Sequence, residues 1–504
     1  MNIVQKKYGL FHGLKLRENK KSSSIPIKIM PSPKRVIIPM QQHLGAECEP
    51  VVNRGDFVKA GQLIGDSASF VSAKIHASID GEVKSILRIV NPVTSGIISA
   101  VEIVSEEIEE GIISNNQLDD EKNQQVQQVN QEPHHKQVNQ QPHQPPSQIN
   151  NQTVSQSGSL SGRQSGSQEN KYEDYEGKYK EYLKTVEKLE PKEFIEKIKE
   201  AGIVGLGGAT FPTHVKLSVP KDKIVDTVIL NGCECEPYIT ADHRLMIEYG
   251  FEMLIGALII FKIINPAGLI IAIEDNKEDA AKSLEQKIFA LGLQEKFKLV
   301  LLPSKYPMGA EKTLIKNILK RKVPVGGLPF DVGVVVQNVA TAKAIFDAVI
   351  LNKPLIERVV TITGDIEHPL NLMVKIGTLL TDMAEYFGKI GDKKYKVIFG
   401  GPMTGFTIGN INFPLTKGTG CILLEKVSPR SESNCIRCSR CVSICPMNLE
   451  PLMYVNFVKN NKYEDCSSYY IESCIECGSC AYICPASIPI VGYIKTGKAV
   501  LSRK

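Results

Sequence analysis

The chain has 504 residues, of which 42% are hydrophobic and 23% are charged, and its formal net charge at pH 7 is +5. This composition is that of a globular protein, and the length is too great for one hydrophobic core, so we expect several domains. So small a net charge argues against a dedicated nucleic-acid-binding protein, and we expect no nucleic-acid partner.

The sequence predicts neither a secretory leader nor a membrane span. The first seven residues lack the apolar core of a signal peptide, which disfavours an oxidising compartment. The most apolar stretch, residues 251–273, contains two charged side chains and is interrupted at Asn265-Pro266, so we predict a buried helix followed by a buried strand. The basic side chains gathered in the first forty residues suit either a partner or lipid surface, or simply a solvated terminus.

Residues 1–114 contain short β-prone runs separated by turn pairs such as Gly55-Asp56 and Asp80-Gly81, which predict a small all-β domain. The stretch from Gly45 to Ile64 resembles the half-motif of biotinyl/lipoyl-type barrel-sandwich domains. Lys74 lies roughly where such domains carry a modified lysine, but its neighbours differ from the usual setting. We therefore expect a structural use of this fold.

Three further segments precede the C-terminal region. Residues 115–171 are dominated by Gln, Asn, Ser, Pro and Gly, which predicts a disordered linker. Residues 172–355 begin with amphipathic helices and then alternate apolar strand-like and helical runs, which predicts a Rossmann-like α/β domain. Residues 356–425 are rich in β-prone runs, with one predicted helix near residues 379–387, and suggest a β-grasp-like insert.

Cysteine is concentrated near the C-terminus, in the segment 426–504. Nine of the 13 cysteines lie between Cys435 and Cys484, and eight of them form two runs of the form Cys-x2-Cys-x2-Cys-x3-Cys-Pro. This is the pattern of bacterial two-cluster ferredoxins, in which the fourth cysteine of each run binds the cluster of the other run. The expected ligand sets are Cys435, Cys438, Cys441 and Cys484 for one 4Fe-4S cluster, and Cys474, Cys477, Cys480 and Cys445 for the other.

A zinc site would instead need Cys-x2-Cys pairs with an ordinary spacer, which this pattern does not offer. Two neighbouring 4Fe-4S clusters relay single electrons. They imply that another part of the chain, or a partner, carries out two-electron chemistry.

A glycine-rich loop opens the α/β region, and its sequence from Gly202 to Thr213 includes Gly-x-Gly-Gly-Ala-x-Phe-Pro. Such a loop lets backbone amides approach a phosphate, which Lys216 would neutralise. Phe211 either stacks on a flat ring or belongs to the core.

The segment Asn231 to Tyr238 directly follows an apolar strand, and strand ends in open α/β sheets are where ligands bind. Glu234 and Glu236 suit hydrogen bonds to ribose, amide or isoalloxazine groups. Cys233 and Cys235 have no second pair nearby, which argues against a metal site there.

Together with residues 306–313 and 336–341, these two segments resemble the flavin- and NADH-binding subunit of respiratory complex I. With a barrel-sandwich domain before them and a two-cluster module after them, the chain resembles the C subunit of the Rnf ion-translocating electron-transport complexes. The resemblance covers nearly everything except the Gln-rich linker. The flavin-binding subunit of complex I holds a single cluster in a helical domain, which favours the Rnf family.

In that family, FMN sits on the glycine-rich loop and NADH stacks against it. By position, the resemblance assigns Gly205, Gly207, Gly208 and Lys216 to the flavin phosphate region, Asn231, Glu234, Gln337 and Asn338 to flavin contacts, and Phe211, Glu236 and Glu311 to nucleotide placement. Two positions depart from the complex I pattern: Leu206 replaces an Arg, and Cys233 replaces an Asp. No catalytic acid or base is expected, because hydride transfer needs none.

The resemblance implies a peripheral subunit on the cytoplasmic face of the inner cell membrane. It would exchange hydride between NAD(H) and FMN and relay electrons through two 4Fe-4S clusters to other subunits, coupled in the complex to ferredoxin and ion transport. One alternative is a soluble flavin reductase similar to microcompartment cobalamin reductases, which usually lack the N-terminal barrel-sandwich domain. Another is an electron-transfer scaffold without a flavin site, although Gly207, Gly208 and Lys216 are all present.

Overall fold

The computed structural model describes residues 4–6, 13–91, 96–105, 166–388, 395–409, 411–428 and 431–502. The chain divides into two compact units, one made of residues 1–105 with 179–504 and the other of residues 106–178. The predicted linker therefore lies outside the described residues as far as residue 165. Helix α2 (Gly166–Lys188) begins six residues before the predicted helix, in a stretch that contains the good helix formers Gln, Glu and Lys.

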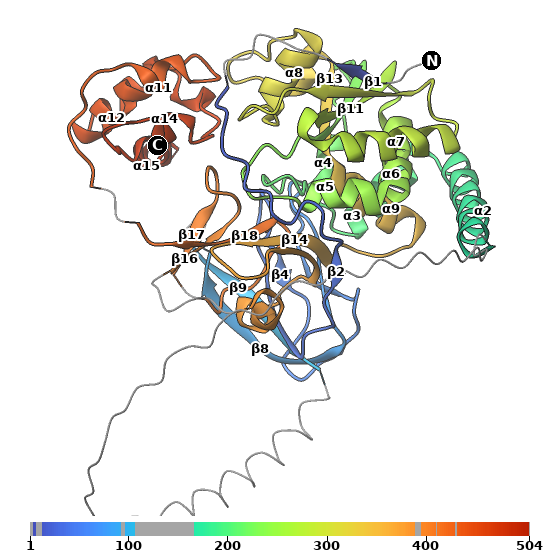
Figure 1. The fold of residues 1–504 in the computed structure, drawn as a ribbon. Helices are drawn as coiled ribbons and strands as arrows, with labels where there is room; N and C mark the ends of the chain where they lie inside the picture. Colours follow the sequence, from blue (N-terminus) through green and yellow to red (C-terminus); the bar gives the residue numbers. More distant parts are fainter. Residues whose placement is uncertain are drawn as a thin grey trace, which may run out of the picture. The chain divides into compact units, whose positions relative to one another are not determined.

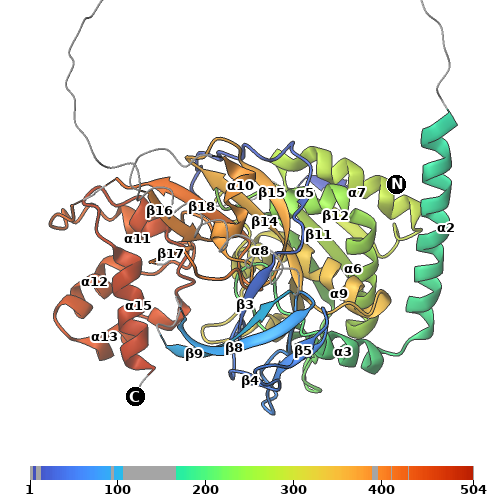
Figure 2. The same cartoon turned by 90° about the horizontal axis from the view of Figure 1, so that it is seen from below.

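The N-terminal domain consists of two small antiparallel sheets packed on one apolar core (Figure 2). Alternate residues of the strands, such as Val36 and Ile38, or Val101 and Ile103, point into this core and are fully buried. The four-stranded sheet has the order β3 (Arg35–Pro39), β9 (Ile97–Val104), β8 (Gly81–Val90) and β5 (Phe57–Val58), and the three-stranded sheet the order β4 (Glu49–Pro50), β6 (Leu63–Asp66) and β7 (Ile75–His76).

The α/β domain is built on a five-stranded parallel sheet. Its order is β1 (Val4–Lys6), β12 (Phe297–Leu302), β11 (Gly268–Glu274), β10 (Thr227–Gly232) and β13 (Val334–Asn338). Because both faces are covered, successive strand residues enter different cores: Val228 and Leu230 join one cluster, and Ile229 joins another.

Helices cover the sheet on both faces (Figure 1). The larger core includes apolar residues of α3 (Pro191–Glu200), α5 (Ala241–Glu248), α6 (Gly250–Ile264), α7 (Glu278–Ala290) and α9 (Val339–Ile350), and the smaller core those of α8 (Glu311–Leu319). The apolar stretch at residues 251–273 forms the buried helix α6 and strand β11, as predicted. Across the described ranges, no helix is both long and apolar enough to cross a membrane.

The direction in which the sheet grows reverses between β10 and β13. From β10 the chain adds β11 and then β12 on one side, and it returns to add β13 on the other side of β10. The carboxyl ends of β10 and β13 are therefore neighbours, with Asn231 opposite Asn338. In open α/β sheets ligands bind outside the carboxyl ends of the strands at such a reversal, and we call the region between the ends of β10 and β13 the crevice.

The predicted insert is a mixed six-stranded sheet that is not continuous in sequence. Strand β2 pairs in parallel with β15 at the edge of this sheet. Residues 13–33, which contain β2, are therefore not part of the N-terminal β domain. We call residues 13–33 the strap. The predicted helix near residues 379–387 is a 3-10 turn followed by α10 (Ala384–Phe387). The strand order is β17 (Phe406–Ile408), β16 (Tyr395–Phe399), β18 (Cys421–Lys426), β14 (Glu357–Gly364), β15 (Leu370–Lys375) and β2 (Lys28–Ile29).

Lys417 joins three of these regions and is 1% exposed. Its Nζ donates to the carbonyl of Lys74 in the N-terminal domain at 2.7 Å and to that of Gly202 at 2.8 Å, while its backbone N–H donates to Gln42 Oε1 at 2.9 Å. Burial lowers the pKa of Lys417 to about 7. The Lys74 ammonium forms ion pairs with Glu200 at 2.8 Å and with Asp66 at 3.5 Å, so both its backbone and its side chain make structural contacts.

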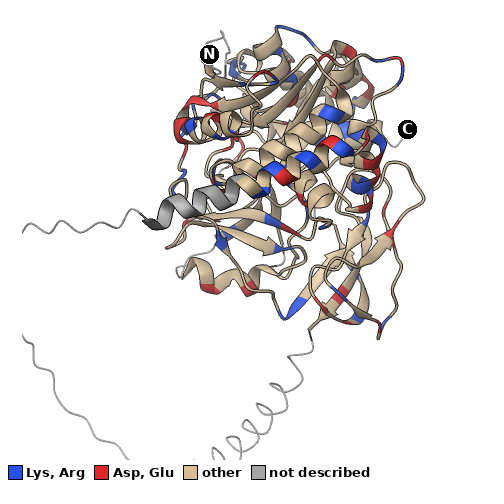
Figure 3. Ribbon diagram, turned by 90° about the vertical axis from the view of Figure 1, so that its right-hand side faces the viewer, with Lys and Arg blue, Asp and Glu red and all other residues tan. Residues whose placement is uncertain are grey.

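The C-terminal module is helical and has its own core around Tyr454, Ile471 and Ile494. Its helices are α11 (Arg440–Ser443), α12 (Pro451–Lys459), α13 (Tyr463–Ser468), α14 (Ser479–Tyr482) and α15 (Ile490–Leu501). In the view of Figure 3, acidic and basic residues alternate along the helices, in keeping with the small net charge.

Candidate functional site

The glycine-rich loop lies beside the crevice between β10 and β13. The N–H of Gly205 donates to the carbonyl of Phe211 at 2.9 Å and closes the loop, and a Cβ added to Gly207 would lie 3.3 Å from Cβ of Asn338 at the end of β13. Gly207, Gly208 and Ala209 are exposed. Gly208 has φ +118°, and no heavy atom lies within 4 Å of the position of a Cβ. The loop thus presents exposed backbone to a ligand.

The end of β13 contributes two amide side chains. Asn338 Oδ1 accepts from the N–H groups of Ala340 at 2.8 Å and Thr341 at 3.3 Å, which caps α9, and its Nδ2 donates to Asp242 Oδ2 at 2.6 Å. Gln337 is 2% exposed, and its Nε2 has no hydrogen-bond partner among the described residues. A buried amide without a partner is costly, so Gln337 fits a site that a ligand completes.

Two other predicted flavin contacts are engaged by the chain itself. Asn231 Nδ2 donates to the carbonyl of Gly309 at 2.8 Å. The Glu234 carboxylate accepts from the N–H groups of Asp242 at 2.7 Å and His243 at 3.2 Å and so caps the N-terminus of α5. Both side chains therefore shape the loop that follows β10.

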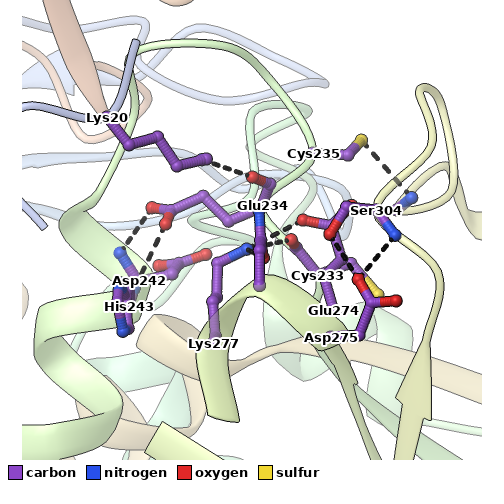
Figure 4. A network of polar contacts seen from close by, with 12 residues as sticks. Lys20, Cys233, Glu234, Cys235, Asp242, His243, Glu274, Asp275, Lys277 and Ser304 are labelled. Carbon is purple, nitrogen blue, oxygen red and sulfur yellow. Dashed lines mark hydrogen bonds and ion pairs between the residues drawn. The ribbon is translucent and has the colours of Figure 1, made fainter. Parts of the chain in front are cut away.

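Two lysines, the half-buried Lys20 and the buried Lys277, bind backbone carbonyls of this loop (Figure 4). Lys20, from the strap, donates to the carbonyls of Glu234 at 2.9 Å, Glu236 at 3.2 Å and Ile239 at 2.6 Å, and burial lowers its pKa. Lys277 is 1% exposed; it donates to the carbonyl of Cys233 at 2.9 Å and pairs with Glu274 at 2.8 Å. Sequence reasoning missed both lysines, because no local pattern connects them to the loop.

Asp242 is a further residue that the sequence analysis did not single out. Burial, and secondarily the charge of Glu234, raises the pKa of Asp242 to about 7. Together with Leu206 and Arg358 it lines a cavity between α5, α9 and β14, and Arg358 donates to the carbonyl of Leu206 at 3.3 Å. A carboxyl group that titrates near neutral pH thus lies beside the crevice.

The remaining predicted residues lie on neighbouring elements. Lys216, in α4 (Thr213–Leu217), pairs with Glu311 of α8 at 2.6 Å, so the structure brings these two together. Glu236 accepts from the N–H of Met403 at 3.2 Å and from Thr404 Oγ1 at 2.5 Å, and burial raises its pKa. Phe211 is half-buried.

The eight predicted cluster ligands line two separate cavities. Cys435, Cys438, Cys441 and Cys484 line one, and Cys445, Cys474, Cys477 and Cys480 line the other. Each cavity thus takes three cysteines from one run and the fourth from the other. Among the side chains that the structure describes, no three His, Cys, Asp or Glu groups gather tightly enough to hold a single metal ion.

The two cysteine runs have the same backbone conformation. Left-handed residues recur at equivalent positions: Arg437 and Glu476, Ser439 and Gly478, and Asn448 and Ser487. Backbone N–H groups donate to the sulfurs of Cys435, Cys445 and Cys474, each at 3.4 Å. Burial raises the pKa of Cys474 to about 11 and of Cys480 to about 12, so cluster binding would have to displace these protons. N–H donors around grouped cysteines fit iron-sulfur clusters.

Three family models match separate parts of the chain. They are the RnfC barrel sandwich hybrid domain over residues 9–108, the Nuo51 FMN-binding domain over residues 198–347 and the 4Fe-4S dicluster domain over residues 434–488. The chain therefore combines a domain for FMN with a domain for two 4Fe-4S clusters. These cofactors define a flavin- and iron-sulfur-containing redox protein.

Curated relatives narrow this class. Over 455 residues the chain is 41% identical to the C subunit of the proton-translocating ferredoxin:NAD(+) oxidoreductase complex of Clostridium ljungdahlii, a match that covers 90% of this chain and 84% of that protein. It is 35% identical over 474 residues to the C subunit of the Na(+)-translocating ferredoxin:NAD(+) oxidoreductase complex of Acetobacterium woodii, covering 93% and 91%. The chain belongs to the RnfC family, the C subunits of Rnf complexes.

A solved NAD+-reducing NiFe-hydrogenase in the H2-reduced state is 18% identical to the chain, with a TM-score of 0.45 over 64% of this chain and 62% of that one.

Proposed function

We propose that the chain is the NADH dehydrogenase subunit of an Rnf-type complex. It brings NAD(H) and FMN together at the crevice between β10 and β13 and relays electrons through two 4Fe-4S clusters to other subunits. In the complex this exchange is coupled to ferredoxin and to ion transport, as the names of the relatives state for those proteins. The observation that carries the proposal is the exposed glycine-rich loop at the sheet reversal, in one chain with two four-cysteine cavities.

The chain's own groups bind and orient the cofactor and the substrate. The exposed backbone of Gly207 and Gly208, in the loop that Gly205 closes, receives the FMN phosphate, and the Gln337 amide group contacts the flavin. Lys216 neutralises phosphate, with Glu311 holding its ammonium in place. Bound FMN supplies the conversion of a two-electron hydride into single electrons.

Three further residues are proposed to lie around the flavin and to act mainly by fixing the backbone there. They are Asn231, Glu234 and Asn338. Each uses its side chain to cap a helix or bind a loop carbonyl, which removes the freedom of the segments that face the crevice. Phe211 and Glu236 are proposed for nucleotide placement, because Phe211 closes the glycine-rich loop and Glu236 lies on the loop that follows β10.

The cysteine sets are proposed as the cluster ligands in the crossed arrangement that the cavities display. We also propose that the protein lies peripherally at the cytoplasmic face of the membrane. Its relatives are subunits of ion-translocating complexes, which supports this placement. A salt wash of membranes that releases the chain intact would agree with it, whereas recovery from the soluble fraction alone would favour the soluble reductase.

An anaerobic titration with NADH tests the function directly. Flavin, iron and sulfide are assayed on the same sample, and we expect about eight irons per chain. Flavin and cluster absorbance should bleach together as NADH is added. A sample with clusters that binds no added FMN and does not respond to NADH would contradict the proposal and leave an electron-transfer scaffold.

A further inference from the structure

One tyrosine hydroxyl connects the α/β domain to the cysteine module. Tyr306 lies on the loop between β12 and α8, is 3% exposed, and donates from its hydroxyl to the backbone carbonyl of Cys477 at 2.5 Å. Its own backbone exchanges two hydrogen bonds of 2.8 Å with Leu14 of the strap, which fixes the position of the residue. Cys477 belongs to the second cysteine cavity.

The same loop reaches the crevice three residues later. The carbonyl of Gly309 accepts from Asn231 at 2.8 Å, and its N–H donates to the sulfur of Cys235 at 3.4 Å. Tyr306 and Gly309 thus lie on one short segment that contacts both the loop after β10 and the cysteine module.

A second contact reaches the same cysteine loop. Glu236 holds the N–H of Met403 at 3.2 Å, and a Cβ added to Gly478 would lie 2.6 Å from the carbonyl of Met403. Only a glycine permits this close approach of the two backbones. Both segments therefore converge on residues 477–478, whereas Cys435 and Cys438 of the other set are exposed.

We propose that Tyr306 is a positioning residue that holds the cluster bound by Cys445, Cys474, Cys477 and Cys480 as the first electron acceptor from the flavin. The inference rests on the proposed function. Each NADH is oxidised to NAD+ and one proton and provides two electrons, and each cluster is reduced by one of them. The set containing Cys435 is then reduced through the set containing Cys477.

The Tyr306 hydroxyl is important because its hydrogen bond connects the loop of Cys477 to the segment 306–309, which contacts the loop after β10. Without it, the Cys477 carbonyl loses a buried partner and the module is held less firmly at its working distance. Because the Tyr306 hydroxyl is directed to the module, we expect its removal to leave the reduction of the flavin by NADH unchanged, so that the two steps can be measured separately.

The test compares Tyr306→Phe with Tyr454→Phe in the full, cofactor-loaded chain. Tyr454 is the matched control, because it lines the same cysteine cavity and its hydroxyl also donates to a backbone carbonyl at 2.5 Å, but that carbonyl, of Tyr469, lies within the module. NADH is mixed anaerobically with each protein, and the flavin and cluster absorbance changes are timed separately. We expect the flavin phase to be unchanged in both variants and the cluster phase to slow in Tyr306→Phe alone, by up to about fivefold, because an ordinary hydrogen bond changes the ratio of correctly placed to displaced modules by about that factor.

An unchanged cluster phase in Tyr306→Phe, or equal slowing in Tyr454→Phe, would overturn the inference. Iron and flavin assays on the same samples show whether a variant has lost cofactors. Loss of half the iron from Tyr306→Phe would support the inference, because one cluster would then depend on this residue. Loss of all cofactors would overturn the inference, because it would show a general structural role. If NADH fails to bleach the flavin of the unaltered chain, the proposed function fails first, and the inference falls with it.

Discussion

The cysteine module and the crevice of the α/β domain hold their functional groups in different ways. In the module, eight cysteines from two short runs line two cavities, and the same left-handed turns recur in each run. In the crevice, the loop after β10 is held by Lys20, which lies 214 residues before Glu234. A site made from a local repeat is specified by spacing, whereas a site made from distant segments is specified by the fold.

The largest effect is expected from breaking the crossed cysteine sets. Cys445→Ser should remove the cluster of the other run and lower iron from about eight to about four per chain, since each cubane cluster holds four irons. Iron analysis with absorbance spectroscopy measures this. Cys466→Ser is the control, because Cys466 is buried but lies outside both cavities. Equal iron loss in both variants would contradict the assignment.

Removing the lysine that supports the crevice should cost stability. Lys20→Met leaves three loop carbonyls without their donor, and we expect about 3 kcal/mol of destabilisation. Thermal unfolding of the flavin domain, followed by release of FMN fluorescence, measures it. The exposed neighbour Lys21→Met should stay within about 0.5 kcal/mol of the unaltered chain. Similar midpoints for the two variants would disprove the supporting role of Lys20.

Backbone strain at the glycine-rich loop tests whether the loop receives FMN. Gly208→Ala forces a side chain into φ +118°, and we expect FMN to bind about tenfold more weakly while iron content is unchanged. Gly292→Ala is matched, because Gly292 also has a positive φ and no atom near its Cβ position, but it lies at the end of α7. FMN titration should show a defect in Gly208→Ala only.

The most gradual predicted effect is a slope of stability with pH that arises from Lys417. Its folded-state pKa of about 7 lies below the ordinary value of 10.5, so between these values the unfolded chain binds a proton that the folded chain lacks. Stability should therefore rise as pH increases from 7 to 9, by at most about 1.4 kcal/mol per pH unit. Unfolding midpoints across this range should rise in the unaltered chain and stay flatter in Lys417→Met. If the unfolding midpoints of the two proteins change with pH in the same way, Lys417 is not the cause of the slope.

The contrast also explains how much the sequence could predict. The spacing of the cysteines predicts which four meet in each cavity, because exchange of the fourth ligand follows from the pattern. The glycine-rich loop and the ends of β10 and β13 can be predicted because each is marked by a short local sequence pattern, either clustered glycines or polar residues after an apolar strand. The helix-capping function of Glu234, by contrast, depends on where α5 begins, and Asn231 depends on a loop that ends near Gly309.

Contacts between distant segments carry no such signal. Strand β2 is only two residues long, and the other strands of its sheet come more than 300 residues later in the chain. A segment this short has no hydrophobic periodicity from which the strand could be predicted. The bond from Tyr306 to Cys477 likewise joins two loops with unrelated local patterns. The near-neutral titration of Asp242 arises from burial and from Glu234, neither of which a sequence pattern encodes.

The strap has a consequence for how the protein is made. Leu14, Lys20 and Ser22 are synthesised well before their partners, because Tyr306, Glu234 and Thr240 are translated hundreds of residues later. The strap must therefore stay unpaired through most of translation, and the α/β domain cannot be completed as each part emerges. Slowed elongation after strand β15 should leave time for the strap to dock, whereas an N-terminal fusion that restrains it should lower the yield of folded protein.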